Sequence, residues 1–330
     1  MAVTLKDIAE KASVSPMTVS KIIRGGNHRI SKETEERVLK IAKDMGYVPN
    51  GAARSLKTRK SKTIGFVLPD IANPFFPEIA RGLDDQAKKH GYSVLMCNTD
   101  NDANEEVKAF RKLAEKMVDG IVFIHSVAND NSMAHLNLKV PVVYVDRGIK
   151  DADQEDAGQI FLDVRSAFYD STNLLIEKGC RNIAFISALY KGRDYRCEGY
   201  SKALKDNGLF FNERFIYRGK YDVNTGVEGV SQILKNNIHI DGIVCGDDLI
   251  AYGAMEAILS KKLRIPEDVK VIGFDDIYFS QYSNPKLTTI AQPAYEMGIE
   301  AGKMLINHIE NGCQLYRQKL EYSLKIRNTV

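Results

Sequence analysis

The sequence predicts a two-part protein, with a small all-α head at the N-terminus and a larger α/β body behind it. Residues 1–62 hold 14 Lys and Arg against 6 Asp and Glu, whereas the rest of the 330-residue chain holds 32 against 37. The basic part has apolar residues at helical spacing. From Thr63 onward, strand-like apolar runs alternate with amphipathic stretches, which is typical of parallel sheets covered by helices.

Three short helices are predicted in the head from their first residues. Thr4 and Asp7 have the spacing of a capping box, and Ser15 before Pro16 reads as an N-cap with proline at the first helical position. Ser31 caps the third helix. Two short helices with a tight turn and a third closing the core form the helix-turn-helix plan, whose second helix enters the major groove. A plain helical bundle would show the same spacing.

The string VTLKDIAEKASVSPMTVSKII, which starts at Val3, resembles the head of the LacI/GalR family of transcription factors almost position by position. The resemblance implies that Pro16, Met17 and Lys21 occupy base-reading positions on the second helix. Lys21 can bond a guanine edge or a phosphate, while Pro16 and Met17 offer only apolar contact, for instance to thymine methyls. Four hydroxyls suit phosphate contacts, although the first two could be helix caps and nothing else: Thr4, Ser15, Thr18 and Ser20.

Residues 50–62 form a predicted hinge between the helix-turn-helix domain, residues 1–49, and the body. The stretch from Asn50 to Leu56 can make one or two helical turns, too few to be stable alone. In the family this segment is a hinge helix that orders on DNA and inserts a leucine into the minor groove, and Leu56 matches that leucine. The resemblance thus adds Asn50, Ala53, Arg54 and Leu56 to the DNA contacts. A buried linker leucine is less favoured because the neighbouring residues are basic.

The body, residues 63–330, is predicted to form two Rossmann-like lobes, because its strand and helix pattern restarts near residues 159–163. We place the first lobe at about 63–160 and 292–320, and the second at about 161–291 and 321–330. Such sheets bind ligands beyond the carboxyl ends of their strands. The expected strands are Ile64–Leu68, Ser93–Cys97, Gly120–Ile124, Val142–Val145, Ile183–Ile186, Gly242–Cys245 and Val269–Gly273, with a last one among residues 320–326.

The loops after these strands combine carboxylates and arginines, which bond hydroxyls, with aromatic rings, which pack on a sugar. Taken singly, an Asp at a strand end is more often a helix N-cap, and Phe75 and Phe76 could be core. The whole body, however, resembles the periplasmic-binding-protein-like effector domain of the LacI family and, more distantly, ribose-binding proteins. The resemblance implies an effector site made of Asn73, Phe75, Phe76, Asp146, Arg147, Arg196, Tyr221, Asp247, Asp275 and Gln292.

In that implied site, Phe75 and Phe76 sandwich the sugar ring and Tyr221 stacks on it from the second lobe. Asp247 departs from the ribose-type pattern, which has asparagine there, before the aspartate that is Asp248 here. A carboxylate accepts hydrogen bonds but does not donate them, so Asp247 favours hydroxyl-rich or cationic ligands over anionic ones.

Other classes of protein are less well supported. The sequence has no phosphate loop, dinucleotide fingerprint, nucleophile elbow or HExxH motif, which argues against an enzyme. The five cysteines have no metal-binding spacing, so no metal or other cofactor is expected. No apolar run is long enough to span a membrane. The N-terminus does not read as a secretory signal, which argues against a periplasmic sugar carrier and for the cytoplasm.

The sequence therefore predicts a cytoplasmic, homodimeric repressor of carbohydrate-utilisation genes that binds a pseudo-palindromic double-stranded operator. A small effector, a ribose-like sugar, is expected to bind between the lobes and to control operator affinity by closing them. Leucine heptads that would build a tetramer are absent from the C-terminal end. The alternative is the same kind of regulator with a nucleobase corepressor or a phosphoprotein partner.

Overall fold

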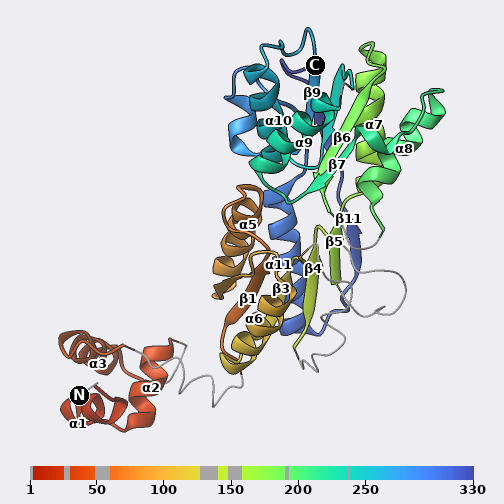
Figure 1. Cartoon of the computed structure of the whole chain (residues 1–330). Coiled ribbons are helices and arrows are strands. Elements are labelled where there is room, and N and C mark those ends of the chain that lie inside the picture. The colour runs from red at the N-terminus through yellow and green to blue at the C-terminus, as the bar shows by residue number, and fades with distance from the viewer. Residues whose placement is uncertain are drawn as a thin grey trace. The chain divides into compact units, whose positions relative to one another are not determined.

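The computed structural model describes residues 3–25, 30–48, 60–126, 140–147, 158–189, 193–236 and 238–330. The chain divides into two compact units, Met1–Ser61 and Lys62–Val330, which we call the head and the body. Figure 1 shows helices alone in the described part of the head and two sheets with their helices in the body.

The head contains three helices, α1 (Leu5–Ala12), α2 (Pro16–Arg24) and α3 (Lys32–Asp44). The predicted caps are confirmed: Thr4 and Asp7 form a capping box, and the Ser15 and Ser31 hydroxyls each accept a hydrogen bond from a backbone N–H three residues on. The three helices bury a common apolar core consisting of Ile8, Ala9, Ala12, Val19, Ile22, Val38 and Ala42.

The first lobe of the body is built on a six-stranded sheet in the order β11-β5-β4-β3-β1-β2, with every neighbouring pair parallel. Its helices are α5 (Phe75–Lys89), α6 (Ala103–Glu115) and α11 (Ala294–Asn311). Its strands are β1 (Thr63–Leu68), β2 (Ser93–Asn98), β3 (Gly120–Phe123), β4 (Val142–Val145), β5 (Gly158–Phe161) and β11 (Arg317–Lys319).

The second lobe repeats this plan with the order β12-β10-β9-β8-β6-β7, in which only β12 runs antiparallel to its neighbour. Its helices are α7 (Val164–Glu177), α8 (Tyr195–Asp206), α9 (Val223–Lys235) and α10 (Asp248–Ser260), with 3₁₀ turns η1 (Glu213–Phe215) and η2 (Tyr278–Gln281). Its strands are β6 (Ile183–Ala188), β7 (Ile216–Gly219), β8 (Gly242–Cys245), β9 (Lys270–Asp275), β10 (Thr288–Ala291) and β12 (Ser323–Lys325).

Helices cover both faces of each sheet, so the central strands are buried and read as continuous apolar runs. Along β1, Ile64 and Phe66 pack with α5 and α11, whereas Val67 packs with Phe110 of α6 on the other face. In the second lobe, α9 and α10 cover one face of the sheet and α7 and α8 cover the other. The alternation follows from the two-residue period of a strand.

The chain passes between the lobes three times, after β5, after β10 and between β11 and β12. As a result α11, which follows the second-lobe strand β10, packs beside α5 in the first lobe (Figure 1). Three connections between the lobes allow them to rotate about a common hinge while each lobe keeps its own core.

The seven strands predicted from apolar runs are all present, with their ends shifted by two residues at most. Four further strands, β5, β7, β10 and β11, were not predicted. Each has only three or four residues, and β7 and β11 lie at sheet edges where few apolar positions are needed. The predicted last strand is shorter than expected and is β12.

Candidate functional site

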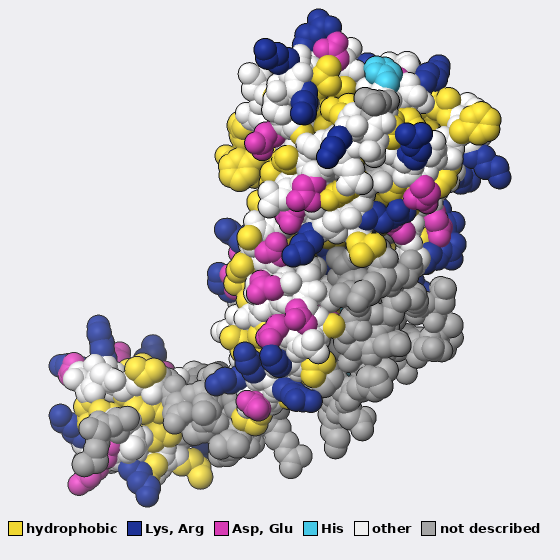
Figure 2. Space-filling model, viewed as in Figure 1, with side chains coloured by type: hydrophobic (Ala, Val, Ile, Leu, Met, Phe, Trp, Pro, Cys, Tyr) yellow, Lys and Arg dark blue, Asp and Glu magenta, His cyan; other side chains and the backbone are white. Residues whose placement is uncertain are grey.

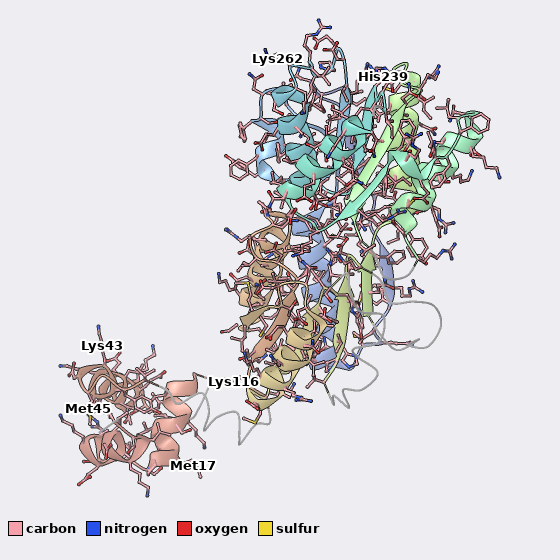
Figure 3. All side chains as sticks on the ribbon, viewed as in Figure 1. Met17, Lys43, Met45, Lys116, His239 and Lys262 are labelled. Carbon is pink, nitrogen blue, oxygen red and sulfur yellow. The ribbon has the colours of Figure 1, made fainter. Side chains whose placement is uncertain are left out.

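The candidate DNA-binding surface is the exposed face of α2. Pro16, Met17 and Lys21 are exposed there, and Ser20 is half-buried. The side chain of Met17 is 69% exposed, and Figure 3 shows it on the outside of the head. Val19 and Ile22, on the opposite side of the same helix, are buried in the head core.

Two predicted phosphate-contacting hydroxyls are engaged as helix caps. Thr4 Oγ1 donates to Asp7 Oδ2 over 2.8 Å, and Ser15 Oγ accepts from the backbone N–H of Thr18 over 3.1 Å. Both residues are exposed, so the capping bonds leave them facing solvent. Lys and Arg side chains are spread over the visible face of the head in Figure 2. The other predicted DNA contacts, Asn50, Ala53, Arg54 and Leu56, lie outside the described residues.

The predicted effector residues converge on one place in the body, the space between the two lobes. Nine of the ten side chains line it: Asn73, Phe75, Phe76, Asp146, Arg147, Arg196, Tyr221, Asp247 and Asp275. The tenth, Gln292, donates from Nε2 to Asp275 Oδ1 over 2.7 Å. We call this set the interlobe site.

The aromatic wall of the interlobe site is set by the start of α5. The Asn73 side chain accepts a hydrogen bond from the backbone N–H of Phe75 over 3.1 Å, which fixes the entry into the helix. The rings of Phe75 and Phe76 lie 5.3 Å apart at 67°. Both are also part of the first-lobe core, so the same two rings pack in the core and line the interlobe site.

Two arginines, the buried Arg147 and the half-buried Arg196, face the ring of Tyr221. The guanidinium carbon of Arg147 lies 5.0 Å from the ring centroid, and that of Arg196 lies 5.5 Å away, distances at which a cation is attracted to the ring. Arg147 comes from the first lobe and Tyr221 from the second, so this contact joins the lobes. Arg196 also lies 5.3 Å from the ring of Phe274 beneath the site.

Three buried carboxylates, Asp146, Asp247 and Asp275, face these arginines. Burial raises the pKa of all three, and raises that of Asp247 to about 6. Asp146 and Asp275 also have positive φ angles, 64° and 122°, a strained backbone conformation that favours glycine. Strain of this kind collects at functional sites, where surrounding structure enforces it.

Asp247 also caps α10, because its Oδ1 accepts from the backbone N–H of Ile250 over 2.8 Å. Its Oδ2 lies 3.4 Å from Asn73 Nδ2, a long hydrogen bond that spans the two lobes. Asp247 therefore caps a helix and lines the interlobe site with one side chain.

Several polar atoms of the interlobe site are buried without a hydrogen-bond partner in the described structure. They are Arg147 Nε, Arg196 Nε and Gln292 Oε1. Buried polar groups are normally paired, so such atoms call for an explanation. The space they surround is small. Its volume is about 10 Å³, roughly the room that one water needs. In the described arrangement of the lobes this space is too small for a sugar.

Comparison with known proteins decides the family. Residues 4–50 match the model of bacterial regulatory proteins of the lacI family, and residues 61–324 match that of periplasmic binding proteins and the sugar binding domain of the LacI family. The chain belongs to the LacI family. It is a DNA-binding transcriptional regulator, as the sequence predicted.

Individual LacI-family relatives agree with this assignment. The chain is 39% identical to the HTH-type transcriptional regulator RegA of Clostridium saccharobutylicum over 93% of this chain and 92% of that one. It is 34% identical to the ribose operon repressor of Halalkalibacterium halodurans, covering 99% and 97%. The solved lac repressor dimer bound to operator and the anti-inducer ONPF is 26% identical, with a TM-score of 0.88 and coverage of 100% and 99%.

Two residues outside the predicted effector set support the interlobe site of this LacI-family chain. Asn101 Oδ1 accepts from Arg147 Nη1 over 3.2 Å, beside a 2.8 Å bond from the same nitrogen to the His125 carbonyl. Asn101 follows β2 in a left-handed conformation, with φ at 57°, and an Asn in a loop carries no local signal that its partner is 46 residues away.

The second residue is Asp248, the aspartate of the ribose-type pattern, which was not assigned to the predicted site. It is fully buried behind the site and accepts three hydrogen bonds, from the Ile277 N–H and from the hydroxyls of Ser280 and Thr289. Burial raises its pKa to about 7. Gly273 makes room for it, because a Cβ there would lie 2.1 Å from Asp248 Oδ1. Asp248 therefore ties α10, β10 and the loop after β9 together.

The described residues of this regulator contain no helix long and apolar enough to cross a membrane. Within the same residues, no group of three or more His, Cys, Asp or Glu has the arrangement of a metal site.

Proposed function

We propose that this regulator is a cytoplasmic, homodimeric repressor of carbohydrate-utilisation genes, and that a small ribose-like sugar in the interlobe site controls its affinity for a pseudo-palindromic operator. In this proposal the interlobe site binds its ligand and performs no chemistry on it. The domain organisation is the one predicted above: a helix-turn-helix head, a hinge at residues 50–62 and a two-lobed body.

One observation carries the proposal: the ten residues that the family resemblance implies for the effector site, scattered from Asn73 to Gln292, surround or bond into one space. Their chemistry suits hydroxyl groups, which donate and accept at once. The donors Arg147 Nε and Arg196 Nε and the acceptor Gln292 Oε1, which have no hydrogen-bond partner in the described structure, match such a ligand. The name of the 34% identical ribose operon repressor adds support for a ribose-like sugar.

The small size of the space supports a mechanism of lobe movement. Across the lobes, Arg147 contacts Tyr221 and Asn73 contacts Asp247. A sugar has to replace these two contacts with its own. Ligand binding therefore changes the relative free energies of open and closed lobe arrangements. The change reaches the DNA-binding part through residues 50–62, which connect it to the body.

A homodimer is supported by the similarity to the lac repressor dimer and by two apolar surfaces of the body. The edge strand β2 exposes Leu95 and Met96, and the η2 turn exposes Tyr278 and Phe279. Monomeric proteins seldom expose apolar groups together on an edge strand. Two heads in one dimer match two half-sites of a palindromic operator.

A ligand screen of the full chain tests the effector class. Thermal unfolding is measured with ribose, other pentoses, hexoses, sugar phosphates, nucleobases and amino acids, because a ligand at 100 times its Kd adds about 2.7 kcal/mol to the free energy of unfolding. We expect stabilisation by ribose or another neutral sugar. Stabilisation by a purine alone would favour the corepressor alternative, and no stabilisation by any compound would favour a phosphoprotein partner.

A further inference from the structure

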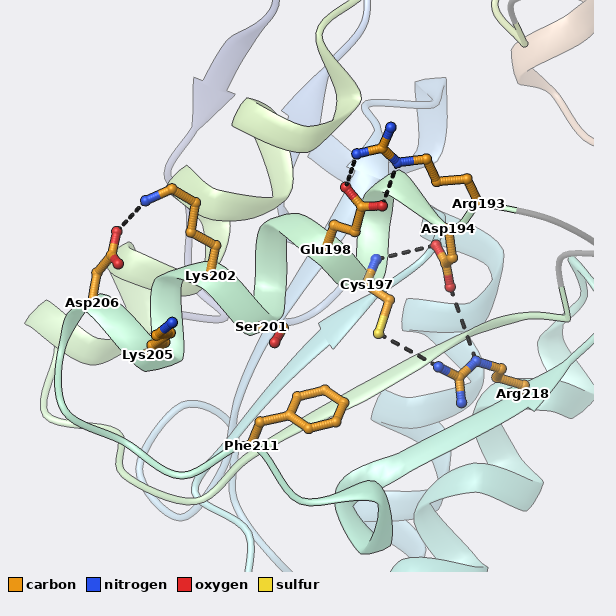
Figure 4. A pocket seen from close by; sticks show the side chains of 10 residues that line it. All are labelled: Arg193, Asp194, Cys197, Glu198, Ser201, Lys202, Lys205, Asp206, Phe211 and Arg218. Carbon is orange, nitrogen blue, oxygen red and sulfur yellow. Dashed lines mark hydrogen bonds and ion pairs between the residues drawn. The ribbon is translucent and has the colours of Figure 1, made fainter. Parts of the chain in front are cut away.

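The second lobe has a further, open pocket between α8 and the edge strand β7. Its volume is about 760 Å³, within the range of small-molecule sites. We call it the α8 groove. Figure 4 shows its lining side chains, which come from the start and one face of α8, from Phe211 and from Arg218 of β7.

The acidic side chains of the α8 groove already have cationic or amide partners. Glu198 accepts from Arg193 Nε over 2.6 Å and pairs with Arg165 over 2.5 Å. Asp206 pairs with Lys202 and accepts from the Tyr169 hydroxyl. Asp194 caps α8 by accepting from the backbone N–H of Cys197. Its Oδ2 is buried without a hydrogen-bond partner and lies 4.0 Å from Arg218 Nε. Because close cations compensate the charges of Glu198 and Asp206, these two acids leave little repulsion against an anion, whereas the charge of Asp194 is offset mainly by Arg218.

The donors of the α8 groove, in contrast, exceed the acceptors. Cys197, Ser201 and Lys205 follow each other at four-residue spacing on one face of α8. Neither the Ser201 hydroxyl nor the Lys205 ammonium has a hydrogen-bond or ion-pair partner within the described structure, and Figure 4 draws no interaction for either.

Arg218 is the third underused donor. Its ion pairs are long, 3.4 Å to Glu213 and 4.0 Å to Asp194, compared with about 2.7–2.9 Å for a strong charge-assisted bond. Its Nη2 lies 3.5 Å from the sulfur of Cys197, a weak acceptor. Burial raises the pKa of Cys197 to about 11, so the thiol stays neutral and does not compensate the guanidinium.

Phe211 supplies an apolar platform beside these donors. Its side chain is 40% exposed, and its ring contacts buried Tyr200 at 6.2 Å, which fixes it from behind. In the view of Figure 4 the ring lies between Lys205 and Arg218. A flat or ring-shaped group can stack on Phe211 while an attached anion meets the cations.

We propose that the α8 groove is a second ligand site, which binds a phosphate ester of a ring compound. Arg218 and Lys205 hold the phosphate, Ser201 donates to it, and Phe211 carries the ring. A nucleoside monophosphate and a sugar phosphate share this chemistry. The arms of the experiment below separate them.

The α8 groove is joined to the interlobe site by the first turn of α8. Arg196 from that turn lines the interlobe site, while Asp194 and Cys197, on either side of it in sequence, contact Arg218 in the groove. A phosphate that draws Arg218 away from Asp194 therefore acts on the turn that holds Arg196. The two ligands change each other's affinity by the same factor, as linkage requires.

The chain has no tryptophan, so Phe211→Trp gives a single fluorescent reporter inside the groove. The full-length variant is titrated with adenosine monophosphate, ribose 5-phosphate, glucose 6-phosphate and inorganic phosphate, and calorimetry repeats the titrations on the unmodified chain. We expect one ester to bind with a Kd of about 1 mM or tighter. Binding should weaken with added salt, since partly exposed charges are screened at about 0.5 M.

Arg218→Gln and Lys205→Gln should each weaken binding about tenfold, whereas Lys235→Gln, an exposed lysine on α9, should leave it unchanged. Thermal unfolding checks that each variant is folded. Tighter binding of adenosine monophosphate identifies a nucleotide site, and tighter binding of an ester without a base identifies a sugar phosphate site. No binding of any probe would overturn the proposal. So would binding that Arg218→Gln leaves intact and Arg196→Ala abolishes, because the ligand would then occupy the interlobe site.

Discussion

The exposed face of α2 and the interlobe site present polar and charged groups in very different surroundings. On α2, Met17 is 69% exposed and Lys21 faces solvent, whereas in the interlobe site Arg147 is 8% exposed and Asp247 3%. An exposed side chain is hydrated until its partner arrives, so replacing it changes binding and leaves folding nearly unaffected. A buried charge has lost its water, so its replacement changes both.

The largest effect should follow from Arg196→Ala. This arginine lies among Tyr221, Phe168 and Phe274. Its removal takes away one of the two cations that face Asp146 and Asp247. Losing one member of such a charged set costs about 2–5 kcal/mol, so effector affinity should fall about 30-fold or more, as measured by calorimetry. Operator binding without effector should persist.

The matched control for this variant is Arg264→Ala, because Arg264 is an exposed arginine of the same lobe in a surface ion pair with Asp268. Surface pairs of this kind contribute little, so the control should bind effector normally. Equal effector affinity in Arg196→Ala and the unmodified chain would remove Arg196 from the site.

Asp247→Asn should change the free energy of unfolding by an intermediate amount that depends on pH. Burial raises the pKa of Asp247 from 3.8 to about 6, so the folded state binds a proton more tightly than the unfolded state does. The free energy of unfolding therefore falls as the pH rises from about 4 to about 6, by about 3 kcal/mol for this group at most. Asparagine carries no charge and still caps α10.

The variant should accordingly be more stable than the unmodified chain at pH 7, and the advantage should disappear towards pH 4. Urea unfolding at a series of pH values measures the difference, in which contributions from unchanged carboxylates cancel. A difference that stays constant across the series would mean that Asp247 is not a buried, titrating group.

The smallest effect should come from Lys21→Ala on the exposed face of α2. Operator affinity should fall a few-fold, and if Lys21 contacts a phosphate, the slope of log affinity against log salt should decrease by about 1. The melting temperature should not change. A shift in melting temperature as large as that of a buried-site variant would show that α2 depends on Lys21 for stability. The exposed face of α2 and the interlobe site would then not differ in their effect on folding.

Much of the head follows from local sequence signals. Thr4 with Asp7, and Ser15 with Pro16, specify helix starts through bonds made within four residues. The apolar runs of the central strands are equally local. The short strands β7 and β11 are not, because three or four residues acquire strand geometry only from a neighbour that supplies the hydrogen bonds.

The interlobe site was predicted by resemblance, and its residues were identified without their supporting contacts. Asn101 and Asp248 act through partners 46 and up to 41 residues away, and no pattern near them indicates those partners. The donors of the α8 groove were not predicted for the same reason, because Arg218 of β7 meets Cys197 of α8 only after the second lobe has folded.

The sequence by itself determined the helix starts of the head, the alternation of strands and helices in the body, and the residue types of both binding surfaces, because these depend on neighbours along the chain. Only the tertiary structure decided which carboxylates and arginines share the closed interlobe site, how far burial shifts the pKa of Asp247, and which donors of α8 and β7 remain unsatisfied. Those properties depend on distance and on exclusion of water, which arise when residues far apart in the chain are packed together.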